Sequence, residues 1–457
     1  MNDGHRAHWL GSWDDSVVWG GTWAVEPGAG VLGGTLDMTT LILQVYGGEL
    51  ASLRSPTVIY GTCSGIEITL FDCYHSSVDD TGGVIQAQNI HVGWAIIGEH
   101  LTSEQRIFDG ASWRHPHLEP WASREPLTPA GDPWRPDGFE HVLHQSLAAT
   151  LEHGEVRLVQ CHSQRQPTRY QVIAQGWEVF EARFREPLSL GEVLNQWVVP
   201  LDRLVNLCVG LDREFYQLRV RRGDTWLDVH LRSSSREPTG EMLHGFQVAL
   251  PLSAVDFAVL VETWLPIHSQ LTPVCATLFS PATNDLPPYP RFMALAAAAD
   301  GLVTRLGLVP RDDQGEKARR QEWDQRRARV LEALDDPSDK SWVDDNLSSP
   351  NPTFVRQLEA LRDLPGPEFS GLFMQHFGPG WPAIFKTVRH AYAHTNHNIE
   401  RYGDVQVEFM ATTLKLLIRV ALLVEIGISG AKLREALGRD KPRRDLMYSY
   451  LVKQEPE

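Results

Sequence analysis

Three histidines and one arginine lie close together near the C-terminus, in the segment TVRHAYAHTNHN at residues 387–398. An imidazole titrates near neutral pH and can take up or release a proton. A guanidinium stays charged and binds phosphate oxygens through a planar fork. Arg389 and His394 therefore supply the two kinds of group that cleavage of a phosphodiester requires. RNA carries its own nucleophile, the 2′-hydroxyl, so this chemistry needs no metal ion.

Two other interpretations of the same histidines stay open. His390 and His394 are four residues apart, so on a helix they share a face, and with His397 they can form a zinc site. However, no glutamate stands where the general base of an H-E-x-x-H motif would be. In the second alternative, the histidines are only polar side chains on the flank of a helix. We expect neither a metal nor another cofactor.

The spacing of Arg389 and His394 sets a geometric condition. Residues five apart on an α-helix differ by about 140° around its axis, so the two side chains diverge unless the helix unwinds or a second chain contributes. A two-fold dimer places two copies of each residue across one axis. One His394 can then act as the base and the other as the acid. We therefore expect a homodimer or a higher homo-oligomer.

The first two thirds of the chain have the pattern of a β-rich domain. Runs of β-branched and aromatic residues, broken by glycine and serine, predict strands and hairpins within residues 40–48, 57–73, 84–98, 170–184 and 215–231. One helix is predicted over residues 188–210, kinked or split at Pro200. Residues 108–138 are predicted to form a long loop, in which Trp113, Trp121 and Trp134 cover the flank of a sheet or form a recognition surface.

After a predicted linker at residues 281–290, the apolar spacing changes to that of helices. Helices are predicted over residues 291–307, 313–336, 352–362, 368–377, 381–396, 404–428 and 430–440. The fold class is therefore α+β: a β-rich N-terminal domain of residues 1–285, with a subdivision near 185–210, and an all-α domain of residues 288–457.

Composition limits the functional classes. The 457 residues have a net charge of −16, which repels a polyanion at long range, so binding to RNA needs a local cationic site. Five scattered cysteines form no C-x-x-C pair, and the N-terminus has no signal-peptide pattern. The longest apolar stretch, residues 411–428, contains Lys415, Arg419 and Glu425, which makes it a poor membrane span. We expect a cytoplasmic protein without membrane contact.

The segment RHAYAH resembles the R-x(4–6)-H motif of HEPN domains, with His390 in the polar position that follows the arginine. Other stretches resemble ApeA-type anti-phage proteins: GGTLDMTTLILQVYGG at 33–48, VIYGTCSGIEITLFDC at 58–73, ARFREPLSLGEVLNQWVVPLDRLVNLCVG at 182–210 and YPRFMALAAAADGLVTRL at 289–306. The resemblance covers nearly the whole chain.

The resemblance implies an abortive-infection effector that is an endoribonuclease acting on RNA, tRNA included. Arg389 and His394 would be its catalytic pair and His390 an auxiliary residue. The helical domain would be a HEPN bundle that forms the dimer. The β-rich domain would sense a phage component or restrain the nuclease. The alternative is a non-catalytic HEPN-like module that binds a nucleotide or a protein and uses the β-rich domain for recognition.

Overall fold

The fold is taken from a computed structural model. It describes residues 18–24, 32–38, 40–46, 57–79, 87–102, 106–124, 127–132, 135–141, 144–168, 171–231, 248–309, 314–346, 352–367, 369–370, 380–393 and 402–439. The chain divides into two compact units, Met1–Leu265 and Pro266–Glu457, and the division lies within helix α4 (Phe257–Gln270). The domain boundary expected near residue 285, and the subdivision near 185–210, stay predictions.

The N-terminal unit is built on antiparallel strands. Among the described residues, fourteen strands are hydrogen-bonded in the order β12-β13-β14-β9-β15-β16-β8-β5-β4-β1-β2-β3-β7-β6, and β10 pairs with β11. Their bounds are β1 Val18–Ala24, β2 Leu32–Asp37, β3 Ile42–Tyr46, β4 Val58–Cys63, β5 Ile66–Phe71, β6 Tyr74–Asp79, β7 Ala87–His91, β8 Trp94–Ile97, β9 Ile107–Arg114, β10 Leu127–Asp132, β11 Arg135–His141, β12 Leu147–Leu151, β13 Gly154–Thr168, β14 Gln171–Ser189, β15 Tyr216–Arg222 and β16 Thr225–Leu231.

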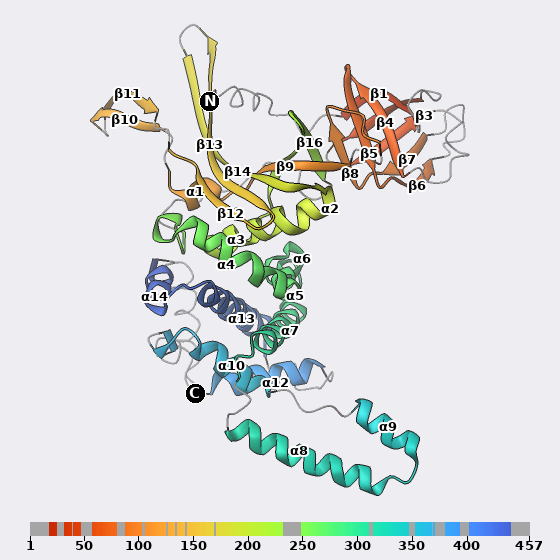
Figure 1. The fold of residues 1–457 in the computed structure, drawn as a ribbon, viewed down its shortest axis with the longest axis vertical. Coiled ribbons are helices and arrows are strands. Elements are labelled where there is room, and N and C mark those ends of the chain that lie inside the picture. The colour runs from red at the N-terminus through yellow and green to blue at the C-terminus, as the bar shows by residue number, and fades with distance from the viewer. Residues whose placement is uncertain are drawn as a thin grey trace. The chain divides into compact units, whose positions relative to one another are not determined.

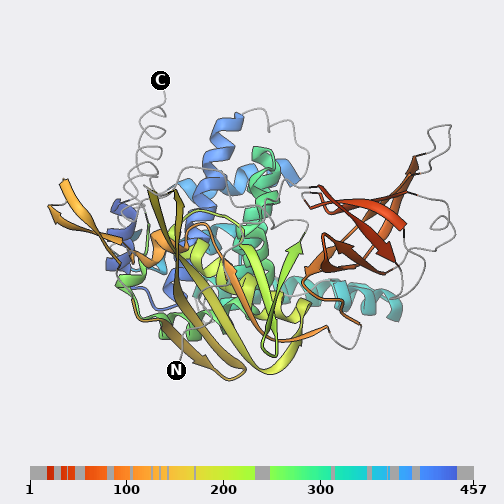
Figure 2. The same cartoon turned by 90° about the horizontal axis from the view of Figure 1, so that it is seen from above.

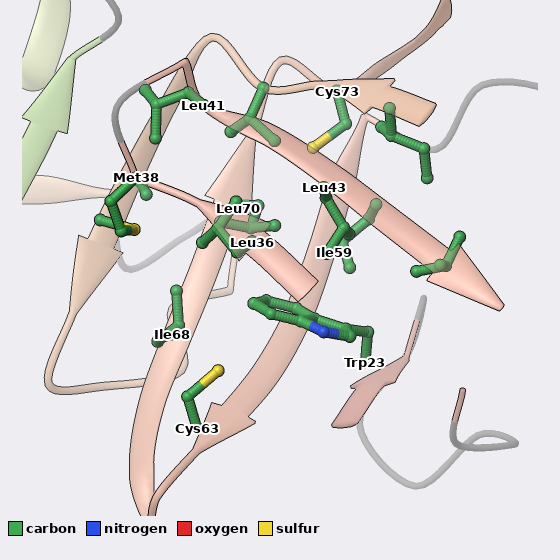
Figure 3. Packing of buried hydrophobic residues seen from close by; sticks show 14 of the residues in the cluster. Trp23, Leu36, Met38, Leu41, Leu43, Ile59, Cys63, Ile68, Leu70 and Cys73 are labelled. Atoms are coloured by element: carbon green, nitrogen blue, oxygen red, sulfur yellow. The ribbon is translucent and has the colours of Figure 1, made fainter. Parts of the chain in front are cut away.

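Strands β1–β8 curl around a core of their own (Figure 1). Alternate residues point inward, as the period of two predicts, and Leu36 and Leu43 are fully buried. Trp23 lies among them (Figure 3). Its ring packs so closely on β4 that a Cβ at Gly61 would lie 2.2 Å from the ring carbons. A glycine is therefore required where the indole crosses the strand.

The rest of the sheet contains β9 and the long β13–β14 hairpin, which both views show (Figures 1 and 2). The predicted loop at 108–138 is wrong, because these residues include most of β9, helix α1 (Leu118–Ala122), β10 and most of β11. Trp113 and Trp121 are fully buried, and Trp121 Nε1 donates to the Leu250 carbonyl at 3.1 Å. These two tryptophans are therefore core residues, whereas Trp134 lies outside the described residues.

The predicted helix over 188–210 is present, and its irregularity lies just before Pro200. Helix α2 (Leu190–Val193) leads into a π-helical turn at Leu194–Val198 and then into α3 (Val199–Val209). Proline has no N–H and crowds the carbonyl one turn earlier, which a regular α-helix cannot accommodate without a break. The wider π-turn is where this break occurs. Trp264 Nε1 donates to the Pro200 carbonyl at 2.7 Å.

The C-terminal unit is helical. The bounds of its helices are α5 Thr272–Phe279, α6 Pro281–Asn284, α7 Pro288–Leu306, α8 Gln314–Ala333, α9 Pro337–Asn346, α10 Phe354–Asp363, α12 Trp381–Ala393, α13 Asp404–Glu425 and α14 Gly430–Arg439. Helix α7 packs along α13 and also against α10 and α12 (Figure 1). The predicted fold class, a β-rich part followed by a helical bundle, is confirmed. The described residues include no helix that is both long and apolar enough to span a membrane.

Candidate active site on helix α12

Helix α12 carries the first part of the R-x4-H segment. Its apolar residues recur at helical spacing, and Trp381, Phe385 and Val388 are buried. The Phe385 ring meets Trp381 edge-on, with centroids 5.0 Å apart, and meets Phe292 of α7 at 6.0 Å. These contacts fix how α12 is rotated about its axis, and hence which way the neighbouring polar residues face.

Arg389 lies at the edge of this buried face and reaches two neighbouring helices. Its guanidinium carbon stands 4.5 Å from the centroid of the Phe354 ring of α10. Its Nη2 is 3.5 Å from Oδ2 of Asp300 on α7. The Arg389 and Asp300 side chains are 31% and 32% exposed. The guanidinium is thus held by the bundle and remains within reach of solvent.

Asp300 is itself held by α10. Gln357 Nε2 donates to Asp300 Oδ1 at 2.5 Å, and the Gln357 side chain is buried. Helix α10 begins at Phe354, and the Thr353 side chain accepts a hydrogen bond from the Arg356 N–H at its N-terminus. Phe354 and Gln357 lie three residues apart, so they share the face of α10 that meets Arg389 and Asp300.

The other two candidate residues have different outcomes. His390 follows Arg389 on α12 and is exposed. Helix α12 ends at Ala393, and His394 and His397 lie outside the described residues. The structure therefore places Arg389 and His390 on one helix, and the pairing of Arg389 with His394 stays a prediction. No group of three or more His, Cys, Asp or Glu is arranged to hold a metal ion within the described ranges.

Tyr289 connects α7 to both ends of the stretch that contains His394. Its ring stacks on Tyr392 of α12, with centroids 5.4 Å apart and planes 13° apart. Its hydroxyl donates to the Tyr402 carbonyl at 2.6 Å, just before α13 begins. Burial, and secondarily the charge of Asp404, raise the pKa of the Tyr289 phenol, which therefore keeps its proton and remains a donor.

Sequence reasoning missed Asp300, Gln357 and Tyr289. Tyr289 is part of PATNDLPPYP, which reads as a linker by composition. Its hydrogen-bond partner Tyr402 is 113 residues away in the chain, and Asp300 is 57 residues from Gln357. No local pattern marks such pairs, because they form only when the helices pack.

Two family models match the chain, one in the β-rich N-terminal unit and one in the helical C-terminal unit. Residues 28–225 match ApeA N-terminal domain 1, and residues 293–432 match Apea-like HEPN. The chain is an ApeA-type protein with a C-terminal HEPN domain. The HEPN match includes Arg389, Asp300 and Gln357, and it extends from α7 into α14.

The ApeA and HEPN assignments confirm the resemblance found in the sequence and support an anti-phage HEPN protein. No curated protein and no solved structure matches the chain. The assignment of the C-terminal region as a HEPN domain therefore depends on the family match and agrees with the helical bundle.

Proposed function

We propose that this protein is a metal-independent endoribonuclease that acts as an abortive-infection effector. HEPN domains are generally nucleases, and this one carries an arginine at the start of an R-x4-H segment. The observation that carries the proposal is the setting of Arg389. Its guanidinium is supported by Asp300 and Phe354 and is still about one third exposed, which suits binding of a phosphate.

Each residue of the motif has a role in the proposed reaction. The ribose 2′-hydroxyl attacks the phosphorus while its proton passes to one His394. The bond from phosphorus to the 5′-oxygen breaks, and the His394 of the partner protomer protonates that oxygen. Arg389 stabilises the charge on the phosphate oxygens, and His390 assists as an exposed auxiliary residue. The products are a 2′,3′-cyclic phosphate and a 5′-hydroxyl end.

The proposal includes partners and a compartment. Two HEPN domains form the dimer that supplies both His394 side chains, and the 140° divergence expected on a regular helix supports such an arrangement. The substrate is RNA, tRNA included. The β-rich unit senses a phage component or restrains the nuclease, and the protein acts in the cytoplasm.

Cleavage in cells tests the proposal. Expression of the wild type should give discrete RNA fragments with 5′-hydroxyl ends, and Arg389→Ala or His394→Ala should lower cleavage at least about 100-fold. The purified protein should remain active in EDTA. Arg356→Ala is a matched control, because Arg356 is an exposed arginine of α10 that pairs with Glu359.

Two results would contradict the proposal. One is cleavage at the wild-type rate by His394→Ala. The other is intact RNA in a stable complex with the wild-type protein, which would favour the non-catalytic module that binds a nucleotide or a protein. Sequencing of RNA ends from cells expressing the wild type and His394→Ala in parallel would also identify the target.

A further inference from the structure

An acidic side chain lies beside the arginine that is proposed to bind phosphate. The Arg389 Nη2 to Asp300 Oδ2 distance of 3.5 Å is longer than an N–H···O hydrogen bond, so the attraction is that of a loose ion pair. A carboxylate at this place also repels an incoming phosphodiester. Asp300 therefore lowers the affinity for RNA, and the question is what it contributes in return.

The carboxylate is fixed independently of Arg389. The 2.5 Å hydrogen bond from Gln357 Nε2 holds Asp300 Oδ1, and Gln357 is only 2% exposed. Asp300 therefore presents its second oxygen from a defined position on α7. A fixed negative charge can orient a mobile cation, whereas a flexible surface carboxylate cannot do so reliably.

Phe354 supplies the second constraint on the guanidinium. The Phe354 side chain is 8% exposed, so its ring is held in the bundle, and Arg389 Cζ lies over it at 4.5 Å. A cation–π contact restrains the distance of the guanidinium from the ring. The charge of Asp300 then selects which direction the guanidinium nitrogens take. Together the two contacts restrain both the place and the orientation of a long, flexible side chain.

We infer that Asp300, anchored by Gln357, is a positioning residue that orients the Arg389 guanidinium for the scissile phosphate. The inference rests on the proposed ribonuclease function. Asp300 acts through Arg389 and does not touch the substrate. Its removal should misplace the guanidinium and lower kcat, and it should also remove a negative charge that opposes RNA binding.

The central test is Asp300→Asn, which keeps an oxygen for Gln357 Nε2 and removes the charge. We expect kcat to fall about 10- to 100-fold, since small misplacements of a catalytic group have effects of that size. The dissociation constant for 2′-O-methyl RNA, which lacks the nucleophile and cannot be cleaved, should stay the same or decrease. A loss of folded protein would instead weaken binding, so this split separates positioning from a structural role.

Two further variants test the route through Arg389. Gln357→Leu removes the donor that anchors Asp300 and should lower kcat in the same direction by a smaller factor. In an Arg389→Ala background, Asp300→Asn should change the residual kcat by no more than about 2-fold, because the effect of Asp300 on the chemical step acts through the missing guanidinium. Asp363→Asn is the matched control, because Asp363 pairs with Arg362 elsewhere in the same unit and its loss should change neither constant.

The outcomes separate this inference from the proposed function. Wild-type kcat in Asp300→Asn beside an inactive Arg389→Ala overturns the inference alone. The inference also fails if Asp300→Asn weakens RNA binding equally with and without Arg389. It fails as well if Asp300→Asn raises kcat, because the carboxylate would then inhibit cleavage. If Arg389→Ala cleaves RNA like the wild type, the proposed function fails and the inference fails with it.

Discussion

Arg389 shows what surrounding residues add to a motif residue. The sequence identifies it by its spacing from His394, and the structure adds Phe354 beneath the guanidinium and Asp300 beside it. Arginine is always charged, so its neighbours act on where that charge is placed. The contacts with Phe354 and Asp300 both act on the orientation of the Arg389 guanidinium.

His115 shows the opposite use of a histidine, as a neutral core group of the N-terminal unit. It is fully buried; its Nδ1 accepts from the His117 N–H at 3.0 Å, and its Nε2 faces Asn206 Oδ1 at 3.2 Å. Burial, and secondarily the charge of His117, lower the pKa of His115 to about 3. Asp202 lies 3.5 Å away, and burial raises its pKa, so the two groups favour their neutral forms.

This shift predicts a pH dependence of stability. Between pH 6.5, the ordinary pKa of the imidazole, and about 3, the unfolded chain binds a proton at His115 that the folded chain excludes. Stability therefore falls as the pH is lowered through this window, by up to about 1.4 kcal/mol per pH unit for this group. The raised pKa of Asp202 acts in the opposite direction, and its contribution is lost as the pH rises through the folded-state value.

The measurement is the free energy of unfolding at pH 7 and pH 5 for the wild type and His115→Gln. Between pH 7 and pH 5 the free energy of unfolding of the variant should fall by about 2 kcal/mol less than that of the wild type. The reason is that a histidine at position 115 takes up a proton on unfolding, whereas a glutamine does not. Asp202 is present in both proteins, so it largely cancels in the comparison. Equal losses would show that His115 is protonated in the folded protein.

At the scale of elements, α7 organises the candidate site. It supplies Asp300 next to Arg389, Phe292 against Phe385, and Tyr289 between α12 and α13. These residues lie along one helix, so they move as a unit. A change in the packing of α7 would therefore disturb several contacts of the candidate site together.

Tyr289→Phe tests the connection between α7 and α13. The variant keeps the ring that stacks on Tyr392 and loses the hydroxyl that donates to the Tyr402 carbonyl. We expect the free energy of unfolding to fall by about 1 kcal/mol, the ordinary net value of one hydrogen bond. Tyr46→Phe is the control, because its hydroxyl donates to the side chain of Gln44, two residues away, and the residue is exposed, so the free energy of unfolding should change by less than about 0.5 kcal/mol. Equal effects would contradict a role for the bond to Tyr402.

At the scale of the whole molecule, charge and assembly bear on function. The net charge of −16 opposes RNA binding at a distance, so affinity must come from groups that the fold presents locally. Arg389 is one such group on the HEPN domain. The proposed dimer doubles it, because a two-fold axis repeats each residue of the site.

The requirement for two His394 side chains predicts a dominant-negative effect. Co-expression of equal amounts of wild type and His394→Ala should leave about one quarter of the dimers with both histidines. Activity per wild-type protomer should then fall to about half. Co-expression with Arg356→Ala is the control and should cause no loss. Undiminished activity beside His394→Ala would show that each protomer works alone.

The sequence correctly predicted the elements whose signal is local. The switch from a period of two to helical spacing predicted the β-rich part and the helices, and all 13 residues of α12, Trp381–Ala393, lie within the predicted helix 381–396. It failed at 108–138, where proline, glycine and tryptophan suggested a loop. Trp113 and Trp121 are buried against residues that are distant in the chain, so the segment itself does not show that they belong to the core.

The candidate site divides in the same way. The sequence by itself determined the α+β class, the family resemblance, and the placement of Arg389 and His390 on one helix. Only the tertiary structure decided that Asp300, Gln357 and Phe354 surround Arg389, and that Tyr289 joins α12 to the start of α13. The reason is physical: helix formation depends on residues three and four apart, whereas a charge, a ring and an amide from three helices meet only when burial of their apolar faces packs those helices together.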